Sequence, residues 1–210
     1  MTDLAAPPRL SKAERGAAMR VRLLDSTIDC LVELGWAGTS TTEVVRRAGV
    51  SRGAQVHHYP SKEDLVLAAI EHLLARRIEE YRLAFEQLPP QRRTPAEAFE
   101  LLWQQCMGRT FEAWLELAVA ARTSPALRTR FVDVERRFAD ATVEQFQGMF
   151  AEAAADREFA TVALRFTFSV LDGLAMARIG GAPEAELDAV RAVFNLVTTP
   201  FLPSSQGEPA

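Results

Sequence analysis

Apolar side chains recur every three or four residues along almost the whole chain, which is the period of an amphipathic α-helix. The alternation of apolar and polar residues that is typical of strands is nearly absent, and no segment repeats at a fixed length. The pattern therefore predicts an all-α fold. Capping residues, glycines and prolines divide it into about nine helices, over residues 13–34, 41–47, 52–59, 62–88, 95–107, 109–122, 125–154, 158–180 and 184–200.

Two of these helices are short and follow each other directly. Ser40 and Glu43 have the spacing of a capping box and open the first of them. Gly49 closes it, Ser51 is placed to cap the second, and Pro60 ends the second. Longer helices precede and follow the pair. The segment therefore predicts a helix-turn-helix, a unit whose second helix fits the major groove of DNA.

The second short helix is too polar to be a core helix. Its polar side chains outnumber the apolar ones, so it needs a polar surface to face: Arg52, Gln55, His57 and His58. Arginine can bind guanine and glutamine can bind adenine in the major groove. No carboxylate or thiol is spaced near the two histidines as a further ligand, so we expect no metal there.

The net charge of −4 over 210 residues argues at first against a protein that binds a polyanion. Residues 1–62, however, hold nine Lys or Arg and six Asp or Glu, a balance of +3, whereas residues 63–210 hold fifteen and twenty-two, a balance of −7. Within residues 46–62 no acid opposes the cations, which are Arg46, Arg47, Arg52 and Lys62. This charge distribution predicts phosphate contacts at one end of an acidic chain.

The stretch TSTTEVVRRAGVSRGAQVHHYPSKEDL, residues 39–65, resembles the DNA-binding signature of TetR-type (TetR/AcrR-like) transcriptional regulators, and the likeness extends over residues 20–70. The resemblance implies an N-terminal three-helix DNA-binding domain and a C-terminal helical ligand-binding and dimerisation domain. It also implies a repressor that leaves its operator on binding a small molecule. The positions where the family contacts DNA are, in this chain, Thr41, Thr42, Ser51, Arg52, Gly53, Ala54, Val56, His57, His58 and Lys62.

The chain departs from the family pattern inside the second short helix. The family usually has a Leu-Tyr pair where this chain has Gln55 and Val56; the Leu packs inward and the Tyr contacts the DNA backbone. Either Val56 takes over the packing and Gln55 turns toward DNA, or the helix is slightly re-aimed. We expect the first arrangement, so Gln55 joins the expected DNA contacts.

The two ends of the chain carry little to bury, so residues 1–12 and 203–210 are predicted to be mobile. Between them we expect a DNA-binding domain over residues 13–60 and a ligand-binding and dimerisation domain over residues 61–202. Basic residues near the start are either an arm that enters the minor groove or solvated side chains: Arg9, Lys12 and Arg15.

Aromatic residues are dense in the middle helices; most must form the core, and others can line an apolar ligand pocket. Asp172 interrupts an apolar run, where an unpaired carboxylate would be costly. It can pair with an arginine, face a dimer partner or bind a cationic ligand; we expect the arginine, namely Arg165, Arg109 or Arg178. Glu116 presents the same choice. The candidate pocket residues are Phe99, Trp103, Cys106, Met107, Phe111, Trp114, Phe138, Phe168 and Asp172.

Two of the last helices carry patterns that favour association. Apolar residues at 3-4-3-4 spacing form a heptad seam on the last helix: Leu187, Val190, Phe194, Val197 and Phe201. Small residues four apart on the helix before it allow close helix packing: Ser169, Gly173 and Ala177. Two such helices from each subunit would make a four-helix interface, so we expect a homodimer.

The function that agrees with these patterns is a ligand-responsive DNA-binding regulator, a repressor that binds a palindromic operator and is released by a small, largely apolar molecule. The alternatives are a helical protein-interaction adaptor, which leaves the cationic motif unexplained, and an all-α enzyme. No Glu precedes a His by three, and no nucleophile elbow or phosphate-binding loop is present, so we expect no enzyme, no cofactor and no metal.

The remaining features bear on where the protein acts. Cys30 and Cys106 cannot form a disulfide framework, and reduced thiols are expected. The chain does not open on a basic segment followed by an apolar one, and its longest uncharged stretch, residues 192–207, is broken by prolines. We therefore expect a cytoplasmic protein without a membrane partner.

Overall fold

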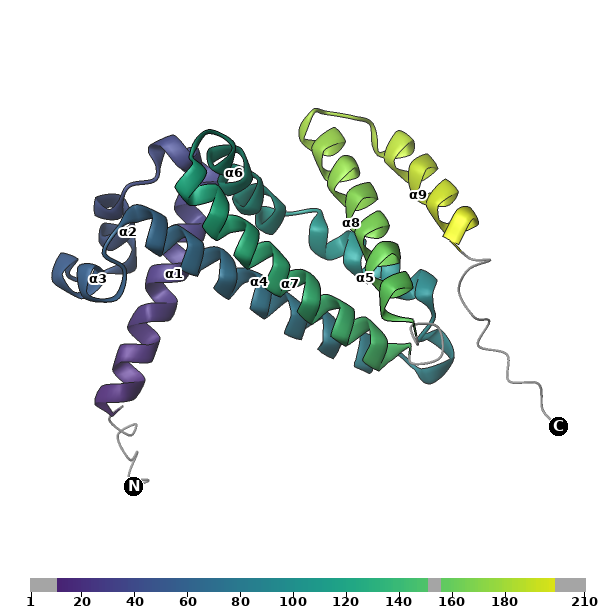
Figure 1. Ribbon diagram of the computed structural model, residues 1–210, viewed down its shortest axis with the longest axis horizontal. Coiled ribbons are helices and arrows are strands. Elements are labelled where there is room, and N and C mark those ends of the chain that lie inside the picture. Colours follow the sequence, from purple (N-terminus) through teal and green to yellow (C-terminus); the bar gives the residue numbers. More distant parts are fainter. Residues whose placement is uncertain (1–10, 151–155, 199–210) are drawn as a thin grey trace, which may run out of the picture. The chain divides into compact units, whose positions relative to one another are not determined.

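The computed structural model describes residues 11–150 and 156–198, and within these ranges the chain is helical and contains no strand (Figure 1). The predicted all-α fold is confirmed. Phe201 and Arg9 lie outside the described residues, as do the ends predicted to be mobile apart from Ser11 and Lys12. The helices are α1 (Lys12–Gly38), α2 (Thr41–Ala48), α3 (Arg52–His58), α4 (Lys62–Gln87), α5 (Pro95–Cys106), α6 (Arg109–Thr123), α7 (Pro125–Met149), α8 (Arg157–Ile179) and α9 (Glu184–Thr198), with a short 3-10 turn at Pro90–Arg92.

Local sequence explains most of the helix starts. The Ser11 hydroxyl accepts from the Glu14 N–H, and the Glu14 carboxylate accepts from the Ser11 N–H, so a complete capping box opens α1 at Lys12. Prolines stand at the first positions of α5 and α7, where a helix has no use for the missing N–H. Helix starts were therefore readable from the sequence to within a few residues.

The chain forms two compact units, Met1–Ile70 and Glu71–Ala210, and the division falls inside α4. In the first unit α2 packs on α1 and α3 packs on α2. Leu34 is 42% exposed and directly precedes Gly35, where the backbone leaves helical geometry with a φ of 67°. The apolar core of this unit contains Leu23, Leu24, Ile28, Leu31, Val44, Leu65, Val66 and Ile70.

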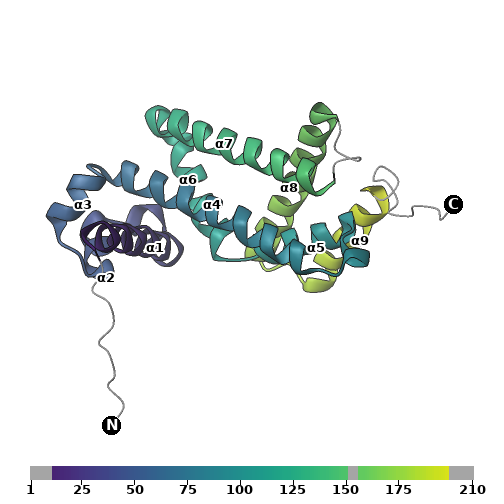
Figure 2. The same ribbon diagram turned by 90° about the horizontal axis from the view of Figure 1, so that it is seen from below.

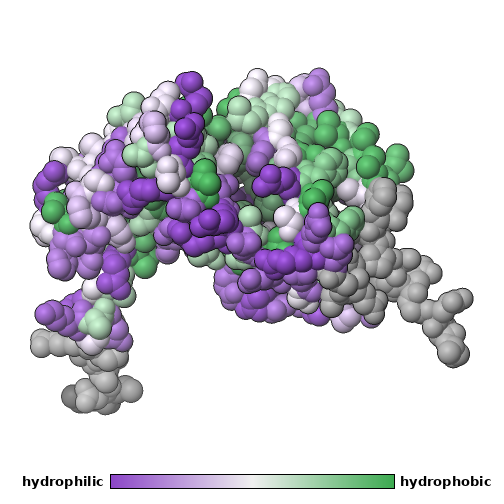
Figure 3. Space-filling view, in the orientation of Figure 1, coloured by the Kyte–Doolittle hydropathy of each residue, from purple (hydrophilic) through white to green (hydrophobic). Residues whose placement is uncertain are grey.

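In the second unit α6 packs on α7, and α8 packs on α5, α7 and α9 (Figure 2). One core cluster of this unit joins α5, α8 and α9. Apolar surface nevertheless gathers over α8 and α9 in the space-filling view (Figure 3). The members of the cluster are Phe99, Trp103, Cys106, Leu171, Leu174, Leu187 and Phe194.

Candidate nucleic-acid interface and effector cavity

The turn between α2 and α3 depends on one glycine. Gly49 has φ 63° and ψ 38°, the left-handed conformation that side chains disfavour, and its N–H donates to the Val45 carbonyl. Ser51 follows in an extended conformation, and its hydroxyl accepts from the Ala54 N–H at 3.2 Å. The predicted helix-turn-helix geometry is thus present, with α3 beginning at an exposed Arg52.

Arg52 brings three of the expected DNA contacts together. Its Nη1 atom donates to the Thr41 hydroxyl at 3.2 Å and to the Thr42 hydroxyl at 3.3 Å. Among the described residues no acid binds this guanidinium. Because two neutral hydroxyls hold the side chain, its full charge remains available to a phosphate or a guanine edge.

The other two arginines of the cationic segment are not available in this way. The Glu43 carboxylate accepts from both Arg46 and Arg47, at 2.6 to 2.8 Å, and Arg47 also binds Glu33 at 2.6 Å. Hydrogen bonds from the two arginines lower the pKa of Glu43 to about 2. The charge balance of residues 46–62 therefore overstates the cations available to DNA, because the acids that pair with Arg46 and Arg47 lie earlier in the sequence. Glu43 is also used differently from the expected capping box, of which only the Ser40 half is present.

Glu43→Gln should strengthen binding to duplex DNA of random sequence, because it removes the acid shared by Arg46 and Arg47. Arg46 is released, whereas Arg47 keeps its pair with Glu33, so the plot of log affinity against log salt concentration should steepen by about 0.9 per subunit, the contribution of one phosphate contact. Fluorescence anisotropy at several salt concentrations measures this slope.

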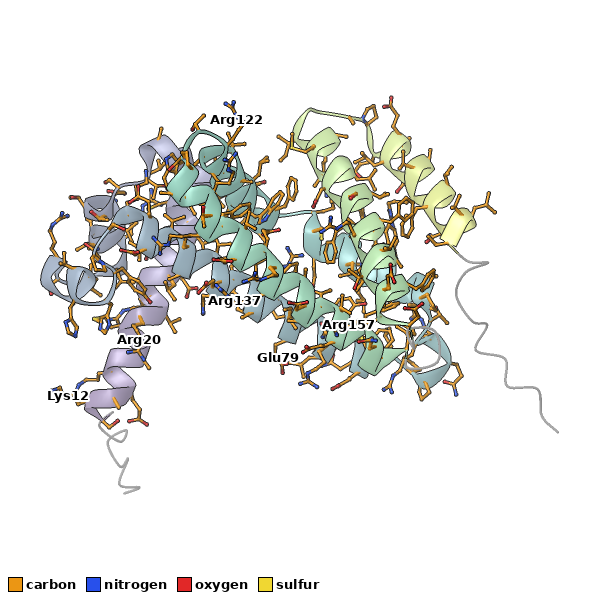
Figure 4. The ribbon with its side chains drawn as sticks, in the orientation of Figure 1. Lys12, Arg20, Glu79, Arg122, Arg137 and Arg157 are labelled. Atoms are coloured by element: carbon orange, nitrogen blue, oxygen red, sulfur yellow. The ribbon has the colours of Figure 1, made fainter. Side chains whose placement is uncertain are left out.

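The matched control is Glu79→Gln, which breaks a similar exposed pair with Arg82 on α4 (Figure 4). It should leave the slope unchanged. An unchanged slope for Glu43→Gln as well would contradict the role assigned to Glu43.

Lys62 lies against Trp36. Its Nζ atom donates to the Trp36 carbonyl and stands 4.3 Å from the centroid of the Trp36 ring. Burial lowers the pKa of this ammonium group. Lys62 therefore joins the start of α4 to the end of α1 in the described structure, in addition to its expected place at the DNA.

Gln55 is oriented opposite to our expectation. Its side chain is 1% exposed, whereas Val56 is 45% exposed. The Gln55 Nε2 atom donates to the Tyr59 carbonyl, and its Oε1 atom is buried without a hydrogen-bond partner. The expectation that Gln55 turns toward DNA and Val56 packs inward is wrong: Gln55 occupies the inward position and satisfies only its amide nitrogen there.

Gln55→Leu should raise the free energy of unfolding by about 1 kcal/mol, because a buried unpartnered acceptor costs about 1–3 kcal/mol and the lost hydrogen bond contributes about 1 kcal/mol. Thermal or urea unfolding measures the gain. Gln55→Ala, which removes the same oxygen but leaves a cavity, should instead be less stable than Leu. A destabilised Leu variant would show that the buried amide contributes more than it costs.

The remaining expected DNA contacts lie on or beside α3. Ser51, Gly53, Val56 and His57 are exposed, and Ala54 and His58 are partly buried. The rings of His57 and His58 meet edge to face, with centroids 5.0 Å apart. No group of three potential metal ligands occurs among the described residues.

Six of the nine candidate pocket residues line one cavity of about 520 Å³ in the second unit. Phe99 instead lines a separate apolar cavity of about 330 Å³, and Met107 lines a third of about 180 Å³. Trp103 belongs to the core cluster, with the Arg191 guanidinium carbon 4.7 Å from its ring centroid. The six residues that line the largest cavity are Cys106, Phe111, Trp114, Phe138, Phe168 and Asp172.

Of the charged residues that line this cavity, two partly buried ones were not singled out from the sequence, Arg77 and Glu135. Arg77 lies three residues after Leu74 and four before Tyr81, so the helical period of α4 could have placed it on the inner face. Glu135 follows Phe131 and precedes Phe138 at the same spacings on α7. In both helices several charged residues follow one another, and periodicity alone does not distinguish the inward one.

The expected pairing of Asp172 with one of three arginines is not found. Arg178 instead binds Glu184 at 3.1 Å, and within the described ranges Asp172 makes no hydrogen bond or ion pair. Burial raises the pKa of Asp172 to about 6, and the charge of Arg77 acts against that rise. Glu116 is partly buried on α6.

The predicted heptad seam of α9 is divided between two surfaces. Leu187 and Phe194 are 2% and 6% exposed and belong to the core of their own chain, so assigning them to a dimer interface was wrong. Val190 and Val197 remain 46% and 48% exposed. The ring of Phe166 on α8 stacks on the ring of Phe194, with centroids 5.7 Å apart, so this side of α9 packs against α8 of the same chain.

One face of α8 is apolar and uncovered. Val162, Phe166 and Met176 are 62%, 47% and 48% exposed, and Ser169 and Gly173 continue the same face between them. By length and composition α8 alone among the described helices could cross a membrane, and 28% of its most apolar window is buried. The helix also carries charged residues whose placement in lipid would be costly, namely Arg165 and Asp172.

Comparisons with known proteins agree with this geometry. Residues 23–69 match the family described as bacterial regulatory proteins, tetR family. The chain is 29% identical to the HTH-type transcriptional regulator CymR of Pseudomonas putida, over 88% of this chain and 91% of that protein. It is 27% identical to the HTH-type transcriptional repressor AcnR of Corynebacterium diphtheriae, over 81% and 86%.

A solved structure shares the fold beyond the helix-turn-helix. A putative transcriptional regulator from Saccharomonospora viridis, crystallised in complex with choline, is 17% identical and aligns with a TM-score of 0.61 over 87% of this chain and 96% of its own. Residues 23–69 thus form a TetR-family helix-turn-helix domain, and over most of its length the chain is similar to HTH-type transcriptional regulators, which supports DNA-binding transcriptional regulation as its function.

Proposed function

We propose that the protein is a cytoplasmic repressor that binds a palindromic operator as a homodimer and is released by a small molecule. Residues 13–60 form the DNA-binding domain, and residues 61–202 form the ligand-binding and dimerisation domain. The observation that carries the proposal is the exposed Arg52 at the start of α3, which is held by two threonine hydroxyls and by no acid among the described residues.

The proposed DNA contacts are α3 and the start of α2. Arg52 reads a base edge, while Thr41 and Thr42 are free to bind phosphate once Arg52 turns to DNA. The exposed Val56 and His57 extend the same helix surface. Gln55 is left out of this set because it is buried. The other proposed contacts are Ser51, Gly53, Ala54, His58 and Lys62.

A second copy of the chain is the proposed cover for the exposed face of α8 and α9. An apolar stripe at 3-4 spacing with a glycine and a serine at its centre suits close antiparallel packing of two helices. A two-fold axis would repeat the stripe on both subunits and place the two α3 helices about 34–36 Å apart, one turn of DNA. On α8 and α9 the proposed contacts are Ser169, Gly173, Ala177, Val190 and Val197.

Release by a small molecule is proposed from the cavity of about 520 Å³. The choline complex of a structural neighbour and the repressor name of a relative favour this assignment. The helix α4 carries Arg77 in the cavity and Lys62 at its start, so a change around Arg77 has a direct covalent route to the DNA-binding unit. A coupling of about 1–3 kcal/mol changes operator occupancy by up to about 100-fold.

Footprinting on the DNA upstream of the protein's own gene and its neighbours tests the proposal. We expect a protected palindrome whose half-sites lie one helical turn apart, and an affinity that falls as salt concentration rises. Reporter expression from that promoter with and without the protein distinguishes repression from activation. Absence of any protected site, or protection of a single half-site, would contradict the proposal.

A further inference from the structure

The cavity of about 520 Å³ in the second unit is lined by aromatic rings and by charged groups. Phe138 and Phe168 meet edge to face with centroids 5.8 Å apart, and Phe111 and Trp114 lie 5.5 Å apart. All four rings line the volume of about 520 Å³. A cavity of this size and lining suits one small organic molecule with an apolar body and a few polar groups.

Asp172 is the polar group in the cavity that the protein itself satisfies least. Within the described ranges its carboxylate has no hydrogen-bond donor and no cation within ion-pair distance. A partly buried carboxylate without a donor is destabilising unless a ligand supplies one. A bound molecule that donates a hydrogen bond to Asp172 would therefore stabilise this carboxylate.

Glu135 adds a second carboxylate to the same cavity. One of its oxygens, Oε1, accepts from Trp114 Nε1 at 2.6 Å, and among the described residues no cation lies within ion-pair distance of this carboxylate. Burial raises the pKa of Glu135, and the charge of Asp172 contributes to the rise. The two carboxylates thus act on one another across the cavity.

Arg77 is the one partly buried cation among the described residues that line the cavity. It donates to Cys106 Sγ at 3.6 Å, a weak interaction. Three further charged residues line the cavity at exposed positions. Arg136 binds Asp133 at 3.0 Å, Asp140 binds Arg157 at 3.4 Å, and Arg165 is exposed on α8. When Asp172 and Glu135 are both ionised, these two carboxylates and the Arg77 guanidinium together carry a net charge of −1.

We propose that this cavity binds an amphipathic organic cation, with a protonated amine or ammonium group at Asp172 and Glu135 and an apolar body against the aromatic rings. The inference rests on the proposed function, in which the cavity holds the effector, and it names the chemical class of that effector. The cation supplies the missing donor to Asp172, neutralises the excess charge, and is attracted by the faces of the surrounding rings.

An anionic effector does not fit the same groups. A carboxylate bound at Arg77 would add a second negative charge beside Asp172 and Glu135 in a partly buried site, where repulsion between like charges is screened weakly. A neutral alcohol would donate one hydrogen bond to Asp172 but leave the excess charge in place. The three classes therefore differ in expected affinity.

Three probes of the same size test the class of ligand: 4-phenylbutylamine, 4-phenylbutan-1-ol and 4-phenylbutanoate. Calorimetry on the full chain should show the amine binding at least about 10-fold more tightly than the alcohol, because hydrogen bonds to charged groups contribute about 1.5–3 kcal/mol. The carboxylate should bind most weakly. Equal affinities, or tighter binding of the alcohol or the carboxylate, would overturn the proposal.

Asp172→Asn locates the cationic end of the ligand. It should weaken binding of the amine at least about 10-fold and leave the alcohol within about threefold, because only the charged probe loses a charge-assisted contact. Asp188→Asn, at an exposed position of α9 outside the cavity lining, is the matched control and should change neither affinity. Loss of alcohol binding in Asp172→Asn to the same extent as amine binding would overturn the proposal.

The amine affinity should also depend on pH. Burial raises the pKa of Asp172 to about 6, so its carboxylate is ionised at pH 7.5 and largely protonated at pH 5, while an alkylamine stays charged throughout. From the neighbouring helices Arg77 acts on Asp172, and the charge of Asp172 in turn acts on Cys106 and Glu135; no described residue of α9 lines the cavity. Affinity should fall as the pH is lowered through 6, and Asp172→Asn should reduce that dependence.

Operator binding by the unmodified protein, measured alongside, separates the two proposals. If the protein binds DNA but does not bind the amine more tightly than the alcohol, the proposed class of ligand is overturned and the proposed repressor stands. Amine binding without any footprint would overturn the proposed repressor and leave the cavity assignment intact.

Discussion

Arg52→Ala should reduce operator affinity by about 30-fold to 10⁴-fold, the largest loss expected from any single side chain of α3. A good arginine contact to a base contributes about 1–3 kcal/mol, and a homodimer loses it twice. The substitution removes two hydrogen bonds to the Thr41 and Thr42 hydroxyls and places a strong helix former at the start of α3, so the fold should be retained. Gel shift on the footprinted operator measures the loss.

Two variants make this experiment specific. Arg52→Lys keeps the charge but not the forked donor geometry, so it should retain phosphate binding and lose discrimination between operator and random DNA. Arg122→Ala, at the end of α6 (Figure 4), removes an exposed arginine from the second unit and should bind the operator normally. An Arg52→Ala protein with unchanged affinity would show that another element reads the DNA.

Gly173→Gln should convert the proposed dimer into a monomer and abolish operator binding. Within its own chain a Cβ at Gly173 meets no atom within 4 Å, and glycine inside a helix costs roughly 0.5–1 kcal/mol relative to alanine. The monomer should therefore fold at least as stably as before. Across a two-fold axis the new side chain clashes twice, at about 1–3 kcal/mol each, which raises the dimer dissociation constant about 30-fold or more.

Sedimentation or light scattering over a range of concentrations measures the change in mass. Gly148→Gln is a closely matched control, because Gly148 is also an exposed helical glycine with no atom within 4 Å of a built Cβ. It should gain the same helix stability and remain dimeric. A dimeric Gly173→Gln protein would place the interface on another surface, and the exposed face of α8 would need a different partner.

The fold was predictable because local interactions between residues close in sequence set the ends of its helices. Ser51 and Pro60 mark α3, Pro95 and Pro125 begin two later helices, and Gly49 adopts the left-handed turn that its position requires. Each of these signals acts within four residues, so no knowledge of tertiary packing was needed.

The candidate sites were less predictable, because they depend on contacts between distant residues or on the rotation of one helix. Arg47 binds Glu33, fourteen residues earlier, which a count over the cationic segment cannot include. Gln55 and Val56 differ in direction by one helical step, and the tertiary packing put the polar one inside. Asp172 was recognised as unusual, but Arg77, which lies 95 positions earlier, was not identified as the cation acting on it.

The shared use of Glu43 by two arginines has a consequence for how the protein searches a genome. Attraction to random DNA comes almost entirely from cations that neutralise phosphates, and here two of the four cations of the segment are bound to acids. We expect short residence on random sequence, little one-dimensional sliding, and a large pool of protein that diffuses freely between encounters. Such a regulator reaches its operator mainly through three-dimensional diffusion, so its response time depends on its concentration more than on the length of flanking DNA.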